Sequence, residues 1–306
     1  MRRFRLGALA GVLLLAACGS GSTAENHQRT VAGSGTLQAL AQGPGQTVAI
    51  TPGDADFAPG PLRYTFLVIA HDGRVVSRPR ATVWVARGLQ NKPFLKTTAT
   101  LEPIGVPGVS KAAKFGVESL YVAHVRIPTA GTYWVLARPS GAKIAGLGNI
   151  VVNPESASPA VGGPAPRSNT PTLSSTGGKL STLTTAKNPD PALYRSSVAQ
   201  AVAARVPFVL TFATPKFCAS RTCGPVVDVV SHVRRQFAKT PVRFIHVEVY
   251  EHNDPAQGYN RWMRQWHLES EPWVFLVGAD GRIKDKFEGS VSAGELQNAV
   301  RRELIR

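Results

Sequence analysis

Residues 207–225, PFVLTFATPKFCASRTCGP, join a strand to a pair of cysteines and decide the fold of the C-terminal part of the chain. The apolar run at 207–213 has no polar alternation, so it predicts a strand buried on both faces. Cys218 and Cys223 follow, with four residues between them. Five positions along one helix span a rise of ~7.5 Å, which exceeds the Cα–Cα separation that a disulfide tolerates. If the two cysteines pair, Cys218 therefore lies in a loop and the helix begins near Cys223. Pro225 fits that boundary, because proline is tolerated in the first turn of a helix.

Outward from this stretch, helix-like and strand-like patterns alternate to the end of the chain. The predicted helices cover 193–205, 226–237, 257–266 and 292–305, and the predicted strands cover 207–213, 242–249, 273–277 and 282–287. Such alternation is typical of an α/β unit.

Several motifs in this part of the chain resemble the thioredoxin-like family. Phe212-Ala-Thr-Pro-Lys-Phe-Cys218 is similar to the family's strand, loop and first cysteine, and Cys223-Gly224-Pro225 repeats part of its Cys-Gly-Pro-Cys motif. Ser270-Glu271-Pro272-Trp273 resembles the loop that holds the family's cis proline. Phe287-Glu288-Gly289, together with the predicted final helix, resembles the C-terminal end of the family's fold. The resemblance covers residues 193–306.

The resemblance implies a C-terminal α/β thioredoxin-like fold with Cys218 and Cys223 as catalytic thiols. It also implies that Glu271 and Pro272 form a cis peptide bond beside the thiols and shape a substrate groove. The sequence departs from the family in its active site, because the family separates its thiols by two residues and this chain by four. Val226 stands where the second cysteine is usual.

The segment between residues 46 and 153 is rich in short β patterns with glycine and proline turns. Strands are expected at 64–70, 81–86, 121–125, 132–137 and 149–152, and His71-Asp-Gly-Arg74 carries an Asp-Gly hairpin signal. No stretch between them has apolar residues at helical spacing, so the segment predicts a β-sandwich. Gly131-Thr-Tyr-Trp-Val-Leu-Ala137 resembles a late strand of immunoglobulin-like domains. The expectation is an N-terminal all-β immunoglobulin-like sandwich over residues 45–154.

The start of the chain has the pattern of an export signal, predicted to cover residues 1–18. A basic segment, Met1 to Arg5, precedes an apolar run that ends at Ala17 and is too short to cross a bilayer as a helix. Leu15-Ala-Ala-Cys18-Gly19 resembles the lipobox of bacterial lipoproteins. The resemblance implies lipidation of Cys18 and an extracytoplasmic protein anchored to the bacterial cell membrane. The alternative is an ordinary cleavage site with an unrelated cysteine.

Two segments have the composition of connectors. Residues 19–44 are small and polar and predict a flexible tether, and residues 155–192 are rich in proline, serine and threonine and predict a linker. The net charge is +16, from 35 Lys and Arg against 19 Asp and Glu. The excess of positive charge is spread over both halves of the chain, whereas a nucleic-acid-binding protein concentrates it in one patch or stripe. The membrane, through the lipid anchor, is therefore an expected partner, and nucleic acid is not.

Three functions are compatible with the cysteine pair. With Cys18 lipidated, Cys218 and Cys223 remain as one pair in a compartment where disulfides persist. The first reading is a thiol–disulfide oxidoreductase whose partners are protein thiols or disulfides of the cell envelope. The second is a binding or scaffold module in which the pair forms a structural disulfide.

The third reading is copper handling, since thiolates and imidazole suit copper. The candidate imidazoles are His246, His252 and His267, although no spacing places any of them beside the thiols. No cofactor and no metal-ligand set is predicted from the motifs, and no hydrolase or nucleotide-binding motif is present.

The sequence offers opposing arguments about which thiol attacks. Order along the chain favours Cys218, since the first cysteine is the nucleophile in the family. Physical chemistry favours Cys223, which is expected at a helix start after a possible N-cap, Thr222, where the helix dipole lowers a thiol pKa. Lys216 and Arg221 add positive potential near both sulfurs. We predict the lower pKa for Cys223.

Overall fold

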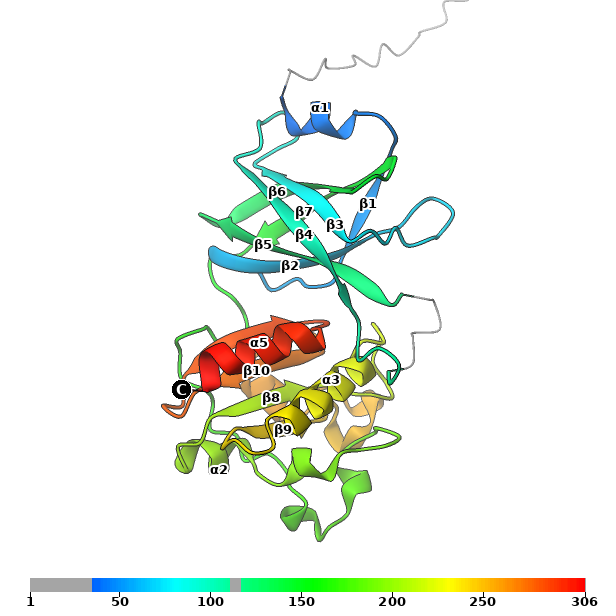
Figure 1. Ribbon diagram of the computed structural model, residues 1–306. Helices are drawn as coiled ribbons and strands as arrows, with labels where there is room; N and C mark the ends of the chain where they lie inside the picture. Colours follow the sequence, from blue (N-terminus) through cyan, green and yellow to red (C-terminus); the bar gives the residue numbers. More distant parts are fainter. Residues whose placement is uncertain (1–34, 111–116, 306) are drawn as a thin grey trace, which may run out of the picture. The chain divides into compact units, whose positions relative to one another are not determined.

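Seven strands of the N-terminal part close into a barrel (Figure 1). The computed structural model describes residues 35–110 and 117–305, so the predicted signal peptide and Cys18 lie outside the described residues. The strands are β1 (Gln46–Pro52), β2 (Gly60–Val68), β3 (Arg80–Ala86), β4 (Leu95–Pro103), β5 (Ser119–Ile127), β6 (Gly131–Pro139) and β7 (Ile144–Val152). Their order around the barrel is β1-β2-β5-β4-β3-β6-β7. Neighbours pair antiparallel, except that β7 pairs with β1 in parallel and so closes the sheet.

The closing pair depends on a glycine. Gly146 of β7 pairs with Val48 of β1, and a Cβ added at Gly146 would lie 2.7 Å from Cγ1 of Ile50. Alternate residues of the strands point inward and fill the barrel with aromatic and β-branched side chains, among them a stacked pair, Tyr64 and Phe66, whose ring centroids are 5.3 Å apart. The absence of a side chain at the closing seam therefore lets the first and last strands approach one another over a packed interior.

The C-terminal part contains a second, smaller sheet with the strand order β11-β10-β8-β9. Its strands are β8 (Phe208–Phe212), β9 (Arg243–Val247), β10 (Trp273–Val277) and β11 (Ile283–Glu288). β8 and β9 are parallel, and β10 is antiparallel to both β8 and β11. Every residue of β8 and β10 is buried, as the continuous apolar runs predict.

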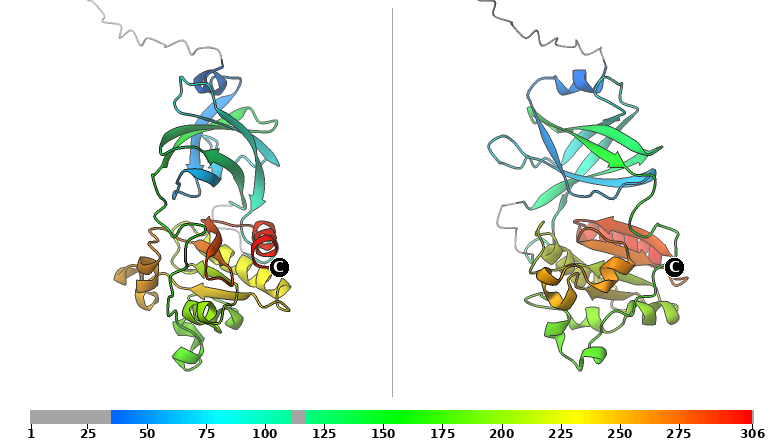
Figure 2. Two further views of the ribbon diagram at one scale, coloured as in Figure 1. Left: turned by 90° about the vertical axis from the view of Figure 1, so that its left-hand side faces the viewer. Right: turned by 180° about the vertical axis from the view of Figure 1, so that it is seen from behind.

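Helices cover both faces of this sheet. On one face, α3 (Cys223–Gln236) and α5 (Ala293–Leu304) bury valines and leucines against Val209, Val274 and Leu276. Figure 1 shows these two helices in front of the sheet, and Figure 2 shows them from two further sides. On the other face, α2 (Val198–Ala203) and α4 (Arg261–Gln265) pack with Trp266 against the phenylalanines of β8 and β10. Both faces of the small sheet are thereby closed to water.

The predicted fold class is wrong for both parts of the chain. The N-terminal strands form one closed barrel and not an immunoglobulin-like sandwich, because β7 reaches β1 and leaves no second sheet. The Asp72-Gly73 turn forms, yet β3 pairs with β4 and β6 and not with β2 across that turn.

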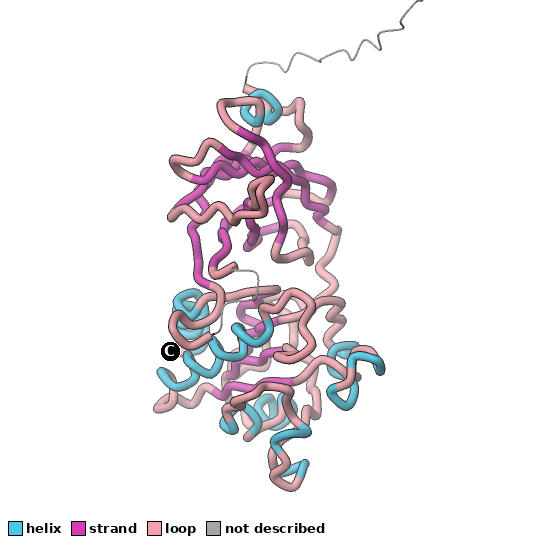
Figure 3. Tube along the Cα trace, turned by 90° about the vertical axis from the view of Figure 1, so that its right-hand side faces the viewer, coloured by secondary structure: helices cyan, strands magenta, loops and turns pink. Residues whose placement is uncertain are grey.

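The C-terminal α/β thioredoxin-like prediction is also wrong, because the chain as a whole is mostly β and its second sheet is small. The strand positions agree with the sequence, but two of the four predicted helices shrink to fragments. The 193–205 helix becomes a 3-10 turn and the six-residue α2, which begins only at the Ser197 capping box. The 257–266 helix becomes the five-residue α4, which begins only after Asn260 caps it. Figure 3 shows these short helical pieces beside the sheet. The C-terminal part is therefore a small four-stranded sheet that packs with two long helices, α3 and α5.

The segment with linker composition packs against the C-terminal sheet. Ala165 belongs to the same apolar cluster as Phe212, and Ser168 is fully buried where its hydroxyl accepts a hydrogen bond from the Trp266 indole at 2.8 Å. The short helix α1 (Leu37–Ala41) buries Leu37 against the barrel wall. The predicted domain boundaries stay predictions. No helix within the described ranges, 35–110 and 117–305, is long and apolar enough to cross a bilayer.

Candidate active site around Cys218, Cys223 and Glu271

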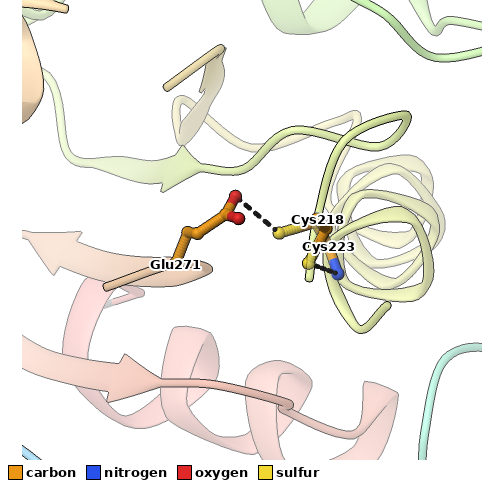
Figure 4. Close-up of side chains that lie close together, drawn as sticks. All are labelled: Cys218, Cys223 and Glu271. Carbon is orange, nitrogen blue, oxygen red and sulfur yellow. Dashed lines mark hydrogen bonds between the residues drawn. The ribbon is translucent and has the colours of Figure 1, made fainter. Parts of the chain in front are cut away.

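Three polar side chains from two distant segments converge at the start of α3. Cys218 lies in the loop after β8, Cys223 is the first residue of α3, and Glu271 immediately precedes β10 through a cis bond to Pro272. The two sulfurs and a carboxylate oxygen of Glu271 all lie within 4.8 Å of one another (Figure 4). The helix begins at Cys223, as the spacing argument requires, and the Glu271–Pro272 bond is cis, as expected. Both cysteines are free thiols in this structure.

The loop returns the Cys218 sulfur to the end of the helix. Arg221 adopts a left-handed backbone conformation, with φ of 60°, which turns the chain back toward α3. The backbone N–H of Cys223 then donates to Sγ of Cys218 at 3.3 Å. Thr222 occupies the N-cap position but makes no side-chain capping bond. The sulfur of Cys218 therefore takes the place that a capping oxygen usually holds at a helix N-terminus.

Cys218 is the acidic thiol of the pair. Hydrogen bonds lower its pKa from 9.0 to about 5, the largest cause being the interaction with the Cys223 side chain, followed by those with the Ser220 hydroxyl and the Cys223 amide. The Sγ–Oγ distance to Ser220 is 3.2 Å. The residue is partly exposed, as reactive cysteines commonly are.

Cys223 has the opposite character, and the prediction that it carries the lower pKa is wrong. The residue is fully buried, and burial raises the pKa of its thiol, with the neighbouring Cys218 and Glu271 charges adding to the effect. The helix N-terminus contributes to lowering a thiol pKa, but that thiol is Cys218 and not Cys223. The amide at the helix start points at the sulfur of Cys218, whereas the Cys223 side chain points into the protein.

Glu271 is the third member of the site, and the sequence placed it only in a substrate groove. Its Oε2 accepts a hydrogen bond from Sγ of Cys223 at 3.2 Å. Burial, followed by the charge of Cys218, raises the pKa of this carboxyl from 4.5 to about 7. The signal was available in the sequence, since the residue before a proline expected beside the thiols is itself beside them. The hydrogen bond between Glu271 and the Cys223 thiol is not predicted from the sequence.

The histidines considered for copper do not join the thiols. His246 lies in β9 with both ring nitrogens engaged: Nε2 donates to the Ala213 carbonyl at 3.0 Å and Nδ1 accepts from the Tyr194 hydroxyl at 2.6 Å. Burial lowers the pKa of His246. His252 and His267 are exposed, and His252 bonds with Gln257. Among the described residues, the donor set that a metal ion could use is Cys218, Cys223 and Glu271.

The chain is similar to solved structures only distantly. No family model matches the chain, and no curated protein matches it. A thiol:disulfide interchange protein of the thioredoxin family from Chlorobium tepidum TLS is similar at 13% identity, with a TM-score of 0.24. The match covers 33% of this chain and 81% of that protein. A likeness this distant leaves the site geometry to carry the functional conclusion.

Proposed function

We propose that the protein is a thiol–disulfide oxidoreductase in which Cys218 attacks and Cys223 resolves. One observation carries the proposal: the sulfur of a partly exposed cysteine accepts the first amide hydrogen of a helix, beside a second, buried cysteine. The first sulfur is held as a thiolate and the second as a thiol. Sequential thiol exchange requires that difference, since the attacking species is the thiolate.

The reaction begins at Cys218. Its thiolate attacks one sulfur of a substrate disulfide, the substrate S–S bond breaks, and the departing thiolate takes a proton from solvent. A mixed disulfide between Cys218 and the substrate is the result. The thiolate charge on Cys218 raises the pKa of the neighbouring Cys223 thiol. Its loss in the first step therefore makes Cys223 easier to ionise for the second step.

Glu271 receives the proton in the second step. The Cys223 thiol passes its proton to the carboxylate at 3.2 Å and attacks the sulfur of Cys218. The second substrate thiolate leaves, and the protein holds a Cys218–Cys223 disulfide. Two electrons have moved from the protein thiols to the substrate, and an external dithiol restores the reduced protein. Run in reverse, the same steps oxidise a substrate dithiol.

The proposed setting is the outside of the bacterial cell membrane. The lipobox-like segment that ends at Cys18 supports a lipid anchor, and an extracytoplasmic location supplies envelope proteins as substrates. Replacing Cys18→Ser and fractionating cells tests this part. Release of the variant from the membrane fraction is expected, and a variant that stays wholly with the membrane and still carries lipid refutes the anchor.

Single-turnover reduction of an aryl disulfide tests the chemistry. The Cys218→Ser protein is expected to release no aryl thiol, whereas the Cys223→Ser protein releases one equivalent and retains the other half as a mixed disulfide detectable by mass spectrometry. The two variants serve as controls for one another, because each keeps one thiol of the pair. Identical behaviour of the two variants contradicts the assigned roles. A reduction potential below about −300 mV marks a structural bridge and refutes the oxidoreductase itself.

A further inference from the structure

Cys218, Cys223 and Glu271 form a donor set of mixed chemistry. Two sulfurs and one carboxylate oxygen lie within 4.8 Å of one another, and the Cys223 Sγ to Glu271 Oε2 distance is 3.2 Å. A tetrahedral zinc ion with bonds of about 2.3 Å to sulfur and about 2.1 Å to oxygen separates two sulfurs by about 3.8 Å and a sulfur from an oxygen by about 3.6 Å. Both separations are shorter than the 4.8 Å within which the three ligand atoms already lie.

We propose that the reduced protein binds one Zn²⁺ ion through the sulfurs of Cys218 and Cys223 and a carboxylate oxygen of Glu271. Two thiolates and a carboxylate suit a borderline ion, because thiolates select Zn²⁺ and Cu⁺ whereas a carboxylate adds little for Cu⁺. Three protein ligands leave the fourth tetrahedral position open. Cys218 and Glu271 are partly exposed residues whereas Cys223 is buried, so the site borders solvent on the side of Cys218 and Glu271.

Metal binding and disulfide formation exclude one another at this site. Binding displaces the Cys223 proton to solvent, since the ligand is the thiolate. Oxidation of the same two sulfurs by a disulfide removes both thiolate ligands, so the ion leaves as the substrate is reduced to two thiols. Zn²⁺ therefore holds the pair in its reduced form and blocks attack by Cys218.

Equilibrium binding of Zn²⁺ alone to the full reduced chain tests the proposal. The chain is purified in detergent with Cys18→Ser, so that the only thiols are Cys218 and Cys223, and a chromogenic chelator competes for the ion. We expect one equivalent of Zn²⁺ per chain and a loss of at least 10- to 100-fold in affinity for Glu271→Gln, the range that supporting residues of metal sites show. The exposed neighbour Glu269 provides the matched control, and Glu269→Gln is expected to leave the affinity unchanged.

Cobalt supplies a second readout. Bound Co²⁺ is expected to give a thiolate-to-metal charge-transfer band that disappears in Cys218→Ser and Cys223→Ser, with circular dichroism confirming that each variant folds. Zn²⁺ binding equal in Glu271→Gln and in the parent overturns the three-ligand site, and so does tight binding of Cu⁺ with no specific Zn²⁺. Binding that survives oxidation to the disulfide overturns it as well. A protein that exchanges disulfides but fails these tests loses the metal site alone, since no substrate is present in the binding experiment.

Discussion

The acidity of Cys218 is open to direct titration. Its pKa of about 5, against an ordinary 9.0, makes the group about 99% thiolate at pH 7, where an ordinary thiol is about 1% thiolate. Alkylation with iodoacetamide follows the thiolate, so its rate at Cys218 is expected to reach half of its maximum near pH 5. Peptide mass spectrometry assigns the label to each cysteine. Cys223, buried and with a raised pKa, is expected to stay unlabelled throughout.

Two substitutions separate the causes of this shift. Cys223→Ala removes the side-chain interaction but keeps the backbone amide, so the pKa of Cys218 is expected to rise and still stay below its ordinary value. Ser220→Ala removes the weaker side-chain donor and is expected to raise the pKa by less. A parent protein in which Cys218 titrates as an ordinary thiol refutes the helix-terminus reasoning. A larger rise for Ser220→Ala than for Cys223→Ala refutes the ranking of the donors.

Three other predictions address the proton acceptor, a buried acid and the barrel seam. Glu271→Gln is expected to slow the resolving step by roughly 100-fold. In the parent the rate of this step is expected to rise as the Glu271 carboxyl loses its proton, at a pH below about 7, because the Cys218 charge that helps to raise the carboxyl pKa is gone in the mixed disulfide. The variant is expected to lack this rise. Acid-quenched mixed disulfide measures both, and an unchanged rate contradicts the role. Burial raises the pKa of Asp54 from 3.8 to about 8, so its contribution to folding stability is complete below 3.8 and is lost as the pH rises through about 8. The melting temperature of the parent is therefore expected to fall as the pH rises toward about 8, and Asp54→Asn is expected to remove that fall. Parallel curves of melting temperature against pH for variant and parent contradict the prediction. Gly146→Ala is expected to lower the free energy of unfolding by about 1–3 kcal/mol. Gly148→Ala is expected to lower it by less, because its Cβ would lie 3.2 Å and not 2.7 Å from an Ile50 carbon. Equal losses for the two variants in urea unfolding contradict a steric limit where β1 meets β7.

Local patterns predicted the elements of the C-terminal sheet well and its fold class poorly. The apolar run of β10 was predicted at 273–277, the bounds the structure gives, because both faces of that strand are buried and its composition shows it. Helix lengths were overestimated where polar residues, Ser197 and Asn260, cap a helix inside an amphipathic stretch. In the barrel, the pairing of β1 with β7 joins strands about a hundred residues apart, and alternation within a strand carries no information about such partners.

The site shows the same division between local and non-local information. The helix start at Cys223 follows from the spacing of the cysteines and from Pro225, both of which are local. The direction of each sulfur does not, because it depends on the left-handed turn at Arg221 and on the position of Glu271, 48 residues beyond Cys223. The pKa order was therefore predicted with the right physics and the wrong geometry.

The four residues between the cysteines explain why the pair is unequal. They are enough for the chain to turn back, so that Cys218 meets the first free amide of α3 from outside the helix, as a capping side chain does. Cys223 is then committed to the helix, and its side chain faces the apolar interior next to Glu271. One sulfur gains donors and the other loses solvent, so the two pKa values move in opposite directions. The proposed stepwise exchange uses both properties. Cys218, as a thiolate, attacks the substrate disulfide, and Cys223, as a thiol, ionises when Glu271 takes its proton. The wide spacing of the cysteines accounts for this difference.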